Sequence, residues 1–425
     1  MKKLLLLLCV FLALSRSAMP DASHTKALSL NAYLQLVLES NLSYAAERYN
    51  VSMADAQIAA ARQIPNPTLG YGFSRDVTYA ASQRLQSNTV GNINQLFELG
   101  GKRKRRTDVA TKSRAAASAT LDGFLNQLRS DASTAFVDAL SQRRLAEKSR
   151  EIAADINQLA KAQAERFKAG QIGEADVLQT EIEAEQFQTS LINIQAQADS
   201  AVQTMGGFLG VEGAWLRVIP LGDLEQSGRT FDVVALTSHA LKERQDLVAL
   251  RHLADAAQSR ISLEKANRVP DLSVGLGVSQ LSSTQNVIAP TPANNSLVIS
   301  FSFPLPIWNQ NKAAIQNAQF AALQAQKQVE AAELSVKVEV QKAFTLYRAA
   351  VSSVDRYRNG ILKKANLVLE ARRTSYQKGQ ATLLELLIAQ RTAQEVRTSY
   401  EAVLATQAKA LVELQRVSSR WDVRF

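Results

Sequence analysis

The sequence is built from two similar halves. A shift of about 203 residues places Pro67 on Pro270, and after small insertions later in the chain Gly170 falls on Gly379. Further matches occur in the same order, and the surrounding residue types agree. The chain is therefore predicted to be an internal duplication, in which each structural element of the first half recurs in the second.

Each half is predicted to contain a helix, a β-hairpin, a very long helix, a tight turn and a further helix. Residues 29–63 are Ala-rich and helical in character, and residues 102–168 contain a single Gly and no Pro. The second stretch would span about 100 Å as one helix. Ile152 and Ile156 follow coiled-coil spacing, with the polar Gln163 at the next seam position. The predicted fold is mainly α, with long coiled-coil helices and four β-strands.

The strand candidates alternate between large apolar and small or polar residues. The apolar positions are Leu69, Tyr71 and Phe73 in the first hairpin, and Leu272, Val274, Leu276, Val278, Leu297, Ile299, Phe301 and Phe303 in the second. One apolar and one polar face is the pattern of a membrane barrel strand, with lipid outside and water inside. A hairpin that packs its apolar face on a soluble core gives the same alternation, so both interpretations remain open at this point.

The number of strands predicts an assembly of several chains. An open sheet edge is not stable in hydrocarbon, and membrane barrels start at about eight strands. Four strands in each chain would give about eight in a dimer or twelve in a trimer, and the spacing of the residues does not choose between them.

The residue inventory disfavours catalysis. The chain has one cysteine, Cys9, and three histidines, His24, His239 and His252, and it shows no Gly-rich phosphate loop. A metal cluster or a nucleophilic triad needs several such residues brought together. The net charge of +10 is spread along 425 residues. We therefore expect no enzymatic activity, no cofactor, no bound metal and no nucleic-acid partner.

The N-terminus has the form of an export signal. Lys2 and Lys3 precede the apolar run from Leu4 to Leu12, and small residues follow near Ser17. This order matches a cleaved signal peptide over residues 1–17, since the apolar run is too short to span a membrane.

The domain organisation follows from these elements. We predict a signal peptide (1–17), a first repeat (18–205, with hairpin 67–97 and turn 170–173), an irregular segment (206–230), a second repeat (231–417, with hairpin 271–305 and turn 379–382) and a C-terminal tail (418–425).

With these features in place, the sequence resembles the TolC-like outer-membrane efflux proteins over nearly its whole length. The resemblance is carried by the repeat, by Pro65-Asn66-Pro67-Thr68-Leu69, and by Arg166-Phe167…Gly170…Asp176-Val177-Leu178 with its counterpart Tyr376…Gly379…Glu385-Leu386-Leu387. Glu98-Leu99-Gly100-Gly101-Lys102-Arg103 and the segment from Pro304 to Lys312 are similar to the CzcC-like heavy-metal branch.

The resemblance implies a homotrimer in the outer membrane. Its 12-stranded barrel would continue into a 12-helix periplasmic tunnel that docks on a periplasmic adaptor (membrane fusion) protein and an inner-membrane pump of the RND type. The chain would be a passive duct, with divalent heavy-metal cations as cargo. The alternatives are a drug or organic-solute duct of the same architecture, a periplasmic coiled-coil adaptor, or an envelope enzyme on a helical scaffold.

The resemblance also assigns roles to the two tight turns. The tips that would contact the adaptor are Gly170, Gln171, Ile172 and Gly173 in the first repeat and Gly379, Gln380, Ala381 and Thr382 in the second. Asp176 and Glu385 would be candidate gate residues, because rings of carboxylates favour cations. Each could equally be a solvated helix residue. Ile388 stands where the family has a second acidic ring, so this chain departs from the family pattern at that position.

Overall fold

A computed structural model describes residues 26–75, 86–210, 213, 218–225, 228–283 and 292–422. The predicted signal peptide lies outside these residues. The chain forms two compact units: a tip unit, which comprises Met1–Ala45, Leu125–Ala240 and Glu339–Phe425, and a sheet unit, which comprises Ala46–Phe124 and Leu241–Val338. Each unit takes segments from both halves of the sequence. The repeats predicted from sequence therefore do not coincide with the compact units.

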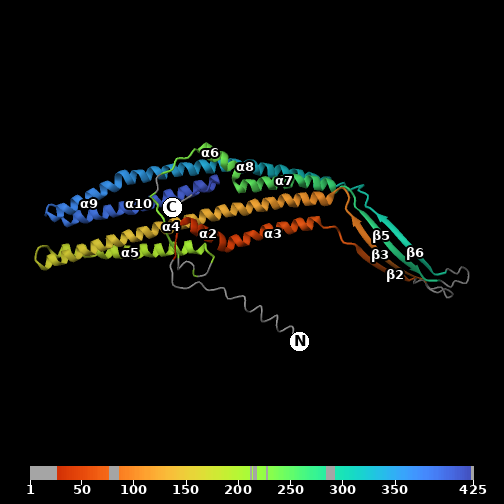
Figure 1. The fold of residues 1–425 in the computed structure, drawn as a ribbon, viewed down its shortest axis with the longest axis horizontal. Helices are drawn as coiled ribbons and strands as arrows, with labels where there is room; N and C mark the ends of the chain where they lie inside the picture. Colours follow the sequence, from red (N-terminus) through yellow and green to blue (C-terminus); the bar gives the residue numbers. More distant parts are fainter. Residues whose placement is uncertain are drawn as a thin grey trace, which may run out of the picture. The chain divides into compact units, whose positions relative to one another are not determined.

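The sheet unit is centred on four antiparallel strands. They are β2 (Thr68–Arg75), β3 (Ser87–Phe97), β5 (Leu272–Leu281) and β6 (Asn294–Ser302), in the order β2-β3-β5-β6 (Figure 1). The two hairpins are joined by pairing of β3 with β5, so each half of the sequence contributes one side of a single sheet.

Each strand continues into a helix. The helices are α3 (Leu42–Arg62), the first part of α4 (Lys102–Lys168), α7 (Gln245–Ala266) and the first part of α8 (Lys312–Arg356). Ion pairs join α3 to α4 (Arg114 Nε to Asp55 Oδ1, 3.0 Å) and α7 to α8 (Arg251 Nη2 to Glu333 Oε1, 2.8 Å). Gly123 of α4 approaches the start of α7 closely. The helices therefore follow the order of the strands to which they are connected.

The tip unit contains two helix hairpins. The second part of α4 pairs with α5 (Glu174–Gly207), and α9 (Leu362–Gln377) pairs with α10 (Leu383–Ser418). Ile152 and Ile156 of α4 pack on Ala184 and Phe187 of α5, as the heptad spacing requires. Among the described residues, no helix combines the length and the apolar content that crossing a bilayer requires.

The helix predicted over residues 29–63 is divided into α2 (Leu30–Ser40) and α3, so the prediction of one helix was wrong in this detail. Asn41 is extended and caps α3, because its Oδ1 accepts a hydrogen bond from the Tyr44 N–H (2.9 Å). Its amide also donates to the Phe208 carbonyl oxygen (2.9 Å). Arg244, 203 residues later, makes the equivalent break between α6 (Val233–Glu243) and α7.

Two further elements were not predicted. A short parallel pair joins β1 (Lys26–Leu28) to β4 (Val218–Pro220) in the tip unit. A π-helical turn, η2 (Tyr357–Ile361), lies between α8 and α9 in the second long helical stretch. The first long helix, by contrast, is continuous from Lys102 to Lys168.

Candidate functional site

The apolar strand residues form rows across the whole sheet. Leu69 pairs with Ile93, which pairs with Leu276, which pairs with Ile299, and these four side chains are 54–81 % exposed. The sheet therefore presents a mainly apolar face that no part of the described chain covers.

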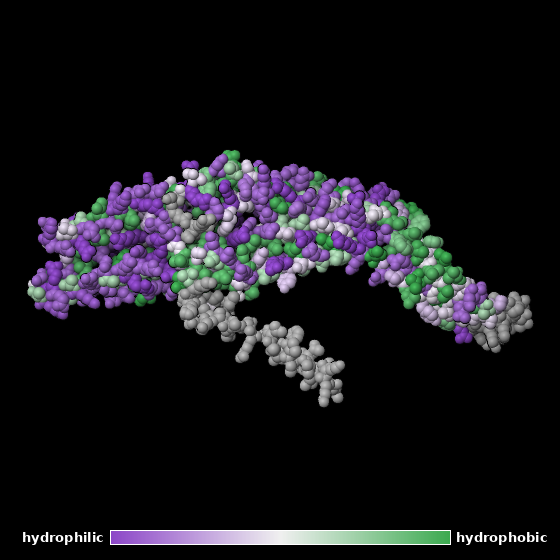
Figure 2. All heavy atoms as spheres, viewed as in Figure 1, coloured by the Kyte–Doolittle hydropathy of each residue, from purple (hydrophilic) through white to green (hydrophobic). Residues whose placement is uncertain are grey.

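The structure places ten of the eleven predicted apolar positions on this one face, and Phe303 lies one residue beyond the end of β6. Nine of the eleven are exposed, and Leu272 and Val274 are half-buried. Figure 2 shows hydrophobic side chains gathered over the strands. A large exposed apolar surface on a folded protein marks a contact with lipid or with another protein.

The opposite face is uncharged and carries small residues. Asn92 and Asn94 lie over the backbone of Gly70 and Gly275 on the neighbouring strands, because a Cβ on either glycine would meet the asparagine Oδ1 at 2.4 and 2.3 Å. The described strand residues on this face are Thr, Ser, Asn and Gly with a few Val and Leu, and none of them is Asp, Glu, Lys or Arg. This face can be wetted without attracting either sign of charge.

The outer strands of the sheet are open. Within the described chain, β2 pairs only with β3 and β6 pairs only with β5. An open edge beside an apolar face requires a partner before it can enter a membrane.

The two tips end their first helices in the same way. In the first tip, the Gly170 N–H donates to the Phe167 carbonyl (2.8 Å) and the Gln171 N–H to the Arg166 carbonyl (2.9 Å). The second tip repeats this pattern, with a 3.0 Å bond from Gly379 and a 2.8 Å bond from Gln380. Both glycines are left-handed, with φ of 70° and 69°. This is the Schellman ending, which needs a residue that tolerates positive φ.

The tips differ in how their second helices begin. Thr382 caps α10 in a capping box, in which its side chain accepts from the Glu385 N–H (3.3 Å) and the Glu385 carboxylate accepts from the Thr382 N–H (2.9 Å). Gly173 precedes α5 and offers no side chain for this purpose.

The two candidate gate carboxylates consequently have different environments. The Glu385 carboxylate is held by Thr382 and by Arg372 (3.3 Å), and the Thr382 backbone N–H is the main cause that lowers its pKa below the usual value for Glu. The Asp176 carboxylate has no hydrogen bond or ion pair among the described residues, and its side chain is half-exposed. Glu385 thus has a structural task, whereas Asp176 is available to other groups.

A cross-link between the two hairpins was not predicted. Gln163 and Arg166 of α4 both donate to the Tyr376 hydroxyl oxygen of α9, the latter at 2.9 Å. The Glu183 carboxylate of α5 binds Arg391 of α10 at 2.6 Å. Gln163 is fully buried. A polar residue at a position of the apolar seam was therefore the sequence signal for this contact.

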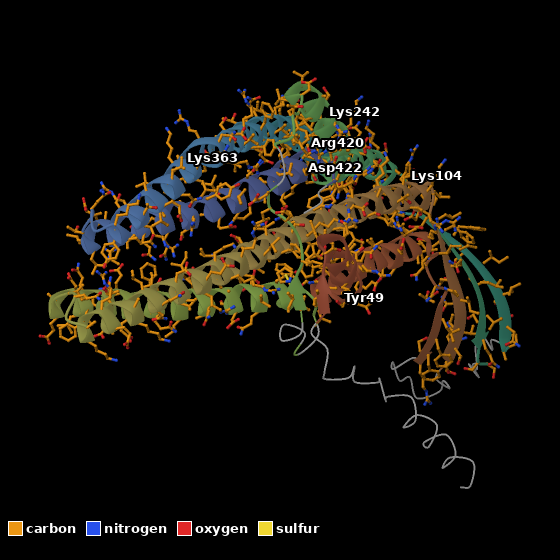
Figure 3. All side chains as sticks on the ribbon, turned by 60° about the vertical axis from the view of Figure 1, so that its left-hand side comes forward. Tyr49, Lys104, Lys242, Lys363, Arg420 and Asp422 are labelled. Atoms are coloured by element: carbon orange, nitrogen blue, oxygen red, sulfur yellow. The ribbon has the colours of Figure 1, made fainter. Side chains whose placement is uncertain are left out.

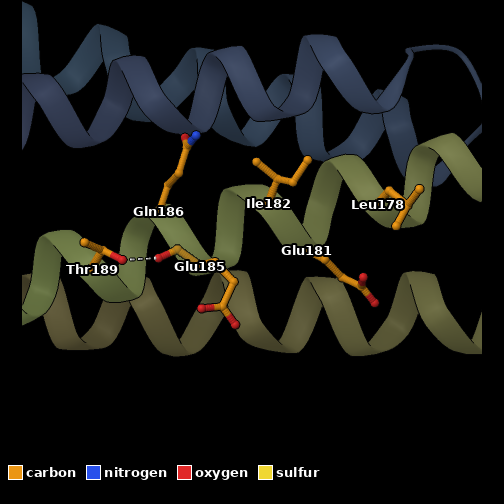
Figure 4. A pocket seen from close by; sticks show the side chains of 6 residues that line it. All are labelled: Leu178, Glu181, Ile182, Glu185, Gln186 and Thr189. Carbon is orange, nitrogen blue, oxygen red and sulfur yellow. Dashed lines mark hydrogen bonds between the residues drawn. The ribbon is translucent and has the colours of Figure 1, made fainter.

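A shallow depression lies along α5 next to its tip (Figure 4). It has a volume of about 470 Å³ and is lined by Leu178, Glu181, Ile182, Glu185, Gln186 and Thr189. Leu178 and Ile182 are exposed although they are apolar. The described residues contain no cluster of three or more His, Cys, Asp or Glu side chains placed to hold a metal ion.

An apolar sheet face with open edges, joined to long helices, is the architecture of a membrane channel protein whose barrel is completed by further chains. The family model described as outer membrane efflux protein matches residues 33–211 and again 236–419, and the chain belongs to this family. The double match agrees with the predicted duplication, and the predicted family and fold class are confirmed.

Two relatives of known name cover most of the chain. The chain is 28 % identical over 398 residues to the cobalt-zinc-cadmium resistance protein CzcC of Cupriavidus metallidurans, which covers 92 % of this chain and 90 % of the relative. It is 23 % identical over 423 residues to the outer membrane protein TolC of Escherichia coli (92 % and 81 %).

Solved structures share the fold at low sequence identity. CusC, described in terms of transmembrane channel formation, superposes with a TM-score of 0.75 at 15 % identity (94 % of this chain, 95 % of the other). A membrane protein from Pseudomonas aeruginosa gives a TM-score of 0.73 at 18 % identity (95 % and 98 %).

Proposed function

We propose that three copies of this chain form the exit duct of a tripartite efflux system. The observation that carries the proposal is the four-strand apolar row, open at both edges, on a chain of an outer-membrane efflux family. Pairing β6 of one copy with β2 of the next continues the rows and removes the edges. Three copies give about twelve strands, above the minimum for a membrane barrel.

The helix-hairpin tips are the proposed contact with the periplasmic adaptor. Gly170 to Gly173 and Gly379 to Thr382 are the turns at which the helices reverse direction, and the depression along α5 adds exposed apolar surface beside the first of them. Beyond the adaptor, an inner-membrane pump of the RND type would supply the energy. Asp176 is the favoured gate carboxylate because it has no partner within the described chain. The absence of enzymatic activity stays a prediction.

Heavy-metal cations are the proposed cargo. The relative CzcC is named for resistance to cobalt, zinc and cadmium, and it is similar along almost its full length. The uncharged polar face of the sheet offers no soft ligands, so metal selection would occur in the pump. The same face would also pass an organic solute, which is the alternative cargo.

Two measurements test the proposal. Purified protein in mild detergent is expected to be trimeric and to require detergent for extraction from membranes; a monomer released by salt alone would refute the duct. A deletion strain is expected to become sensitive to zinc, cobalt or cadmium and to recover with the wild-type gene. Drug hypersensitivity with unchanged metal tolerance would transfer the cargo assignment to organic solutes.

A further inference from the structure

Unpaired cations surround the helix-proximal end of the sheet. Here the four strands of the sheet unit join α3, α4, α7 and α8 through the links 63–67, 98–101, 267–271 and 303–311. The cations at these junctions, called here the cationic collar, are Arg62, Arg103, Lys104, Arg105, Lys265, Arg268 and Lys312. All seven are exposed, and none of their side chains has a hydrogen bond or ion pair within the described part of the chain.

Three carboxylates near the collar are already bound to other cations. Glu98 binds Arg106 (2.6 Å), Asp271 binds Lys102 (2.7 Å), and Glu264 binds Arg260 (3.0 Å). Asp108, one turn after Lys104 in α4, would offset a single charge, so the seven cations keep a net positive charge.

Helix stability does not explain the collar at the start of α4. Arg103, Lys104 and Arg105 occupy its first turn, which contains no acidic residue. The N-terminus of a helix carries positive partial charge, so cations there oppose the helix dipole. Figure 3 shows Lys104 where α4 meets the strands. Cations that destabilise the helix on which they stand indicate a ligand of negative charge.

The same four junctions also expose apolar side chains. Ile64, Leu99 and Val269 are exposed at the first three, and the link from β6 to α8 exposes Leu305, Ile307 and Trp308, the last of which is 93 % exposed. A tryptophan and other apolar groups beside cations are typical of the boundary between hydrocarbon and lipid headgroups.

We infer that the cationic collar binds anionic phospholipid headgroups of the periplasmic leaflet. This inference rests on the proposed function, which places the sheet in the outer membrane with the helices in the periplasm. In that orientation the apolar rows lie in the hydrocarbon, the exposed apolar residues of the junctions lie at its boundary, and the collar lies at the depth of the phosphates. The guanidinium groups of Arg103 and Arg105 suit phosphate oxygens in particular, because they can donate two parallel hydrogen bonds.

The test compares lipids on the purified full-length trimer. Phosphatidylglycerol or phosphatidylcholine is added to protein in a neutral detergent, and the lipid concentration that gives half of the rise in Tm is measured. The variant is R103Q/K104Q/R105Q, which is expected to fold because it removes cations that oppose a helix dipole. The matched control is K242Q/K363Q/K364Q, which removes the same charge from exposed residues remote in sequence from the junctions.

Phosphatidylglycerol is expected to stabilise the wild type and the control at similar concentrations. The triple variant should require about fivefold more lipid for each cation removed. A triple variant that responds like the wild type would overturn the inference, as would an equal effect of phosphatidylcholine or of inorganic phosphate. If the triple variant folds poorly, the three single variants are measured instead. An unchanged half-effect concentration of phosphatidylglycerol in all three would also overturn the inference. A sample that is monomeric and extracted by salt would instead refute the proposed duct.

Discussion

The two helix-ending glycines should control the stability of the tips without affecting the rest of the molecule. Gly170 and Gly379 have positive φ, and a Cβ on either would meet no atom within 4 Å. Replacement by Val therefore causes no steric clash, and its cost is conformational. A non-Gly residue in the left-handed region costs about 1–2 kcal/mol, with valine at the upper end because it is β-branched.

We expect this conformational cost to make the substituted tip open more often. Relaxation of either backbone breaks the two hydrogen bonds of the Schellman ending. Raising the free energy of the closed tip by about 1–2 kcal/mol relative to the open tip increases the open population roughly fivefold to thirtyfold. Hydrogen exchange at the amides of Gln171 and Gln380 measures this population directly, since these amides donate the outer bond of each ending. We expect faster exchange at the substituted tip, an unchanged trimer in detergent, and reduced export.

Gly173 provides a matched control within the first tip. It has an ordinary extended backbone (φ of −79°) and equally open surroundings, and the second repeat carries Thr at the corresponding position. Thr is β-branched and close to Val in size, and it is as good an N-cap residue as Gly. Gly173→Thr should therefore leave the exchange of the Gln171 amide, which reports the Schellman ending, close to that of the wild type. Normal exchange and normal export in both Gly170→Val and Gly379→Val would refute the argument that these turns depend on positive φ.

Three further predictions concern single side chains. Because the pKa of Glu385 is lowered in the folded chain, its contribution to stability is present above the usual Glu pKa and is lost as the pH falls through the lower folded value. The exchange of the tip amides in E385Q should therefore be less pH-dependent than in the wild type as the pH falls below about 4.5. Gly277→Ala places a methyl group 2.9 Å from a carbonyl oxygen of the neighbouring strand and should lower the yield of detergent-stable trimer. The control Gly72→Ala meets nothing within 4 Å and should leave the yield unchanged. Equal yields for the two variants would contradict the close approach at Gly277. Tyr376→Phe leaves the buried Gln163 amide without an acceptor and should weaken the contact between the hairpins by about 1–3 kcal/mol. The loss is measured as faster hydrogen exchange at the seam. Unchanged exchange would show that this cross-link is dispensable.

The strands and the first long helix could be predicted because their signals are strong over many residues. Alternation of apolar and small residues sets the faces of β5 and β6, and the absence of Pro over residues 102–168 allows a single helix with the observed bounds. The breaks at Asn41 and Arg244 were missed because both residues stand within apolar helical periodicity. At Asn41 the break depends on a hydrogen bond to Phe208, which is distant in sequence.

The smaller elements and the cross-link could not be predicted for related reasons. β1 and β4 have three residues each, too few to show alternation, and they form only by pairing with each other. The π-helical turn has no distinctive sequence apart from one glycine. For Tyr376 the signal was indirect: a buried polar residue in a coiled-coil seam must find a partner, but nothing in the spacing identifies a tyrosine 213 residues away.

The duplication explains why the two tips are built alike and why they differ in one useful respect. Both end their first helix with a left-handed glycine, and both carry a carboxylate three residues after the N-cap of the second helix. In the second repeat, Thr382 turns that carboxylate into part of a capping box, so Glu385 is occupied in holding its own helix. In the first repeat, Gly173 cannot form the box, and Asp176 keeps a carboxylate with no partner in the described chain. The same position is therefore structural in the second repeat and free in the first. Three copies of the chain would bring three such free carboxylates around one axis. In the proposed duct, this difference supports Asp176 rather than Glu385 as the gate carboxylate.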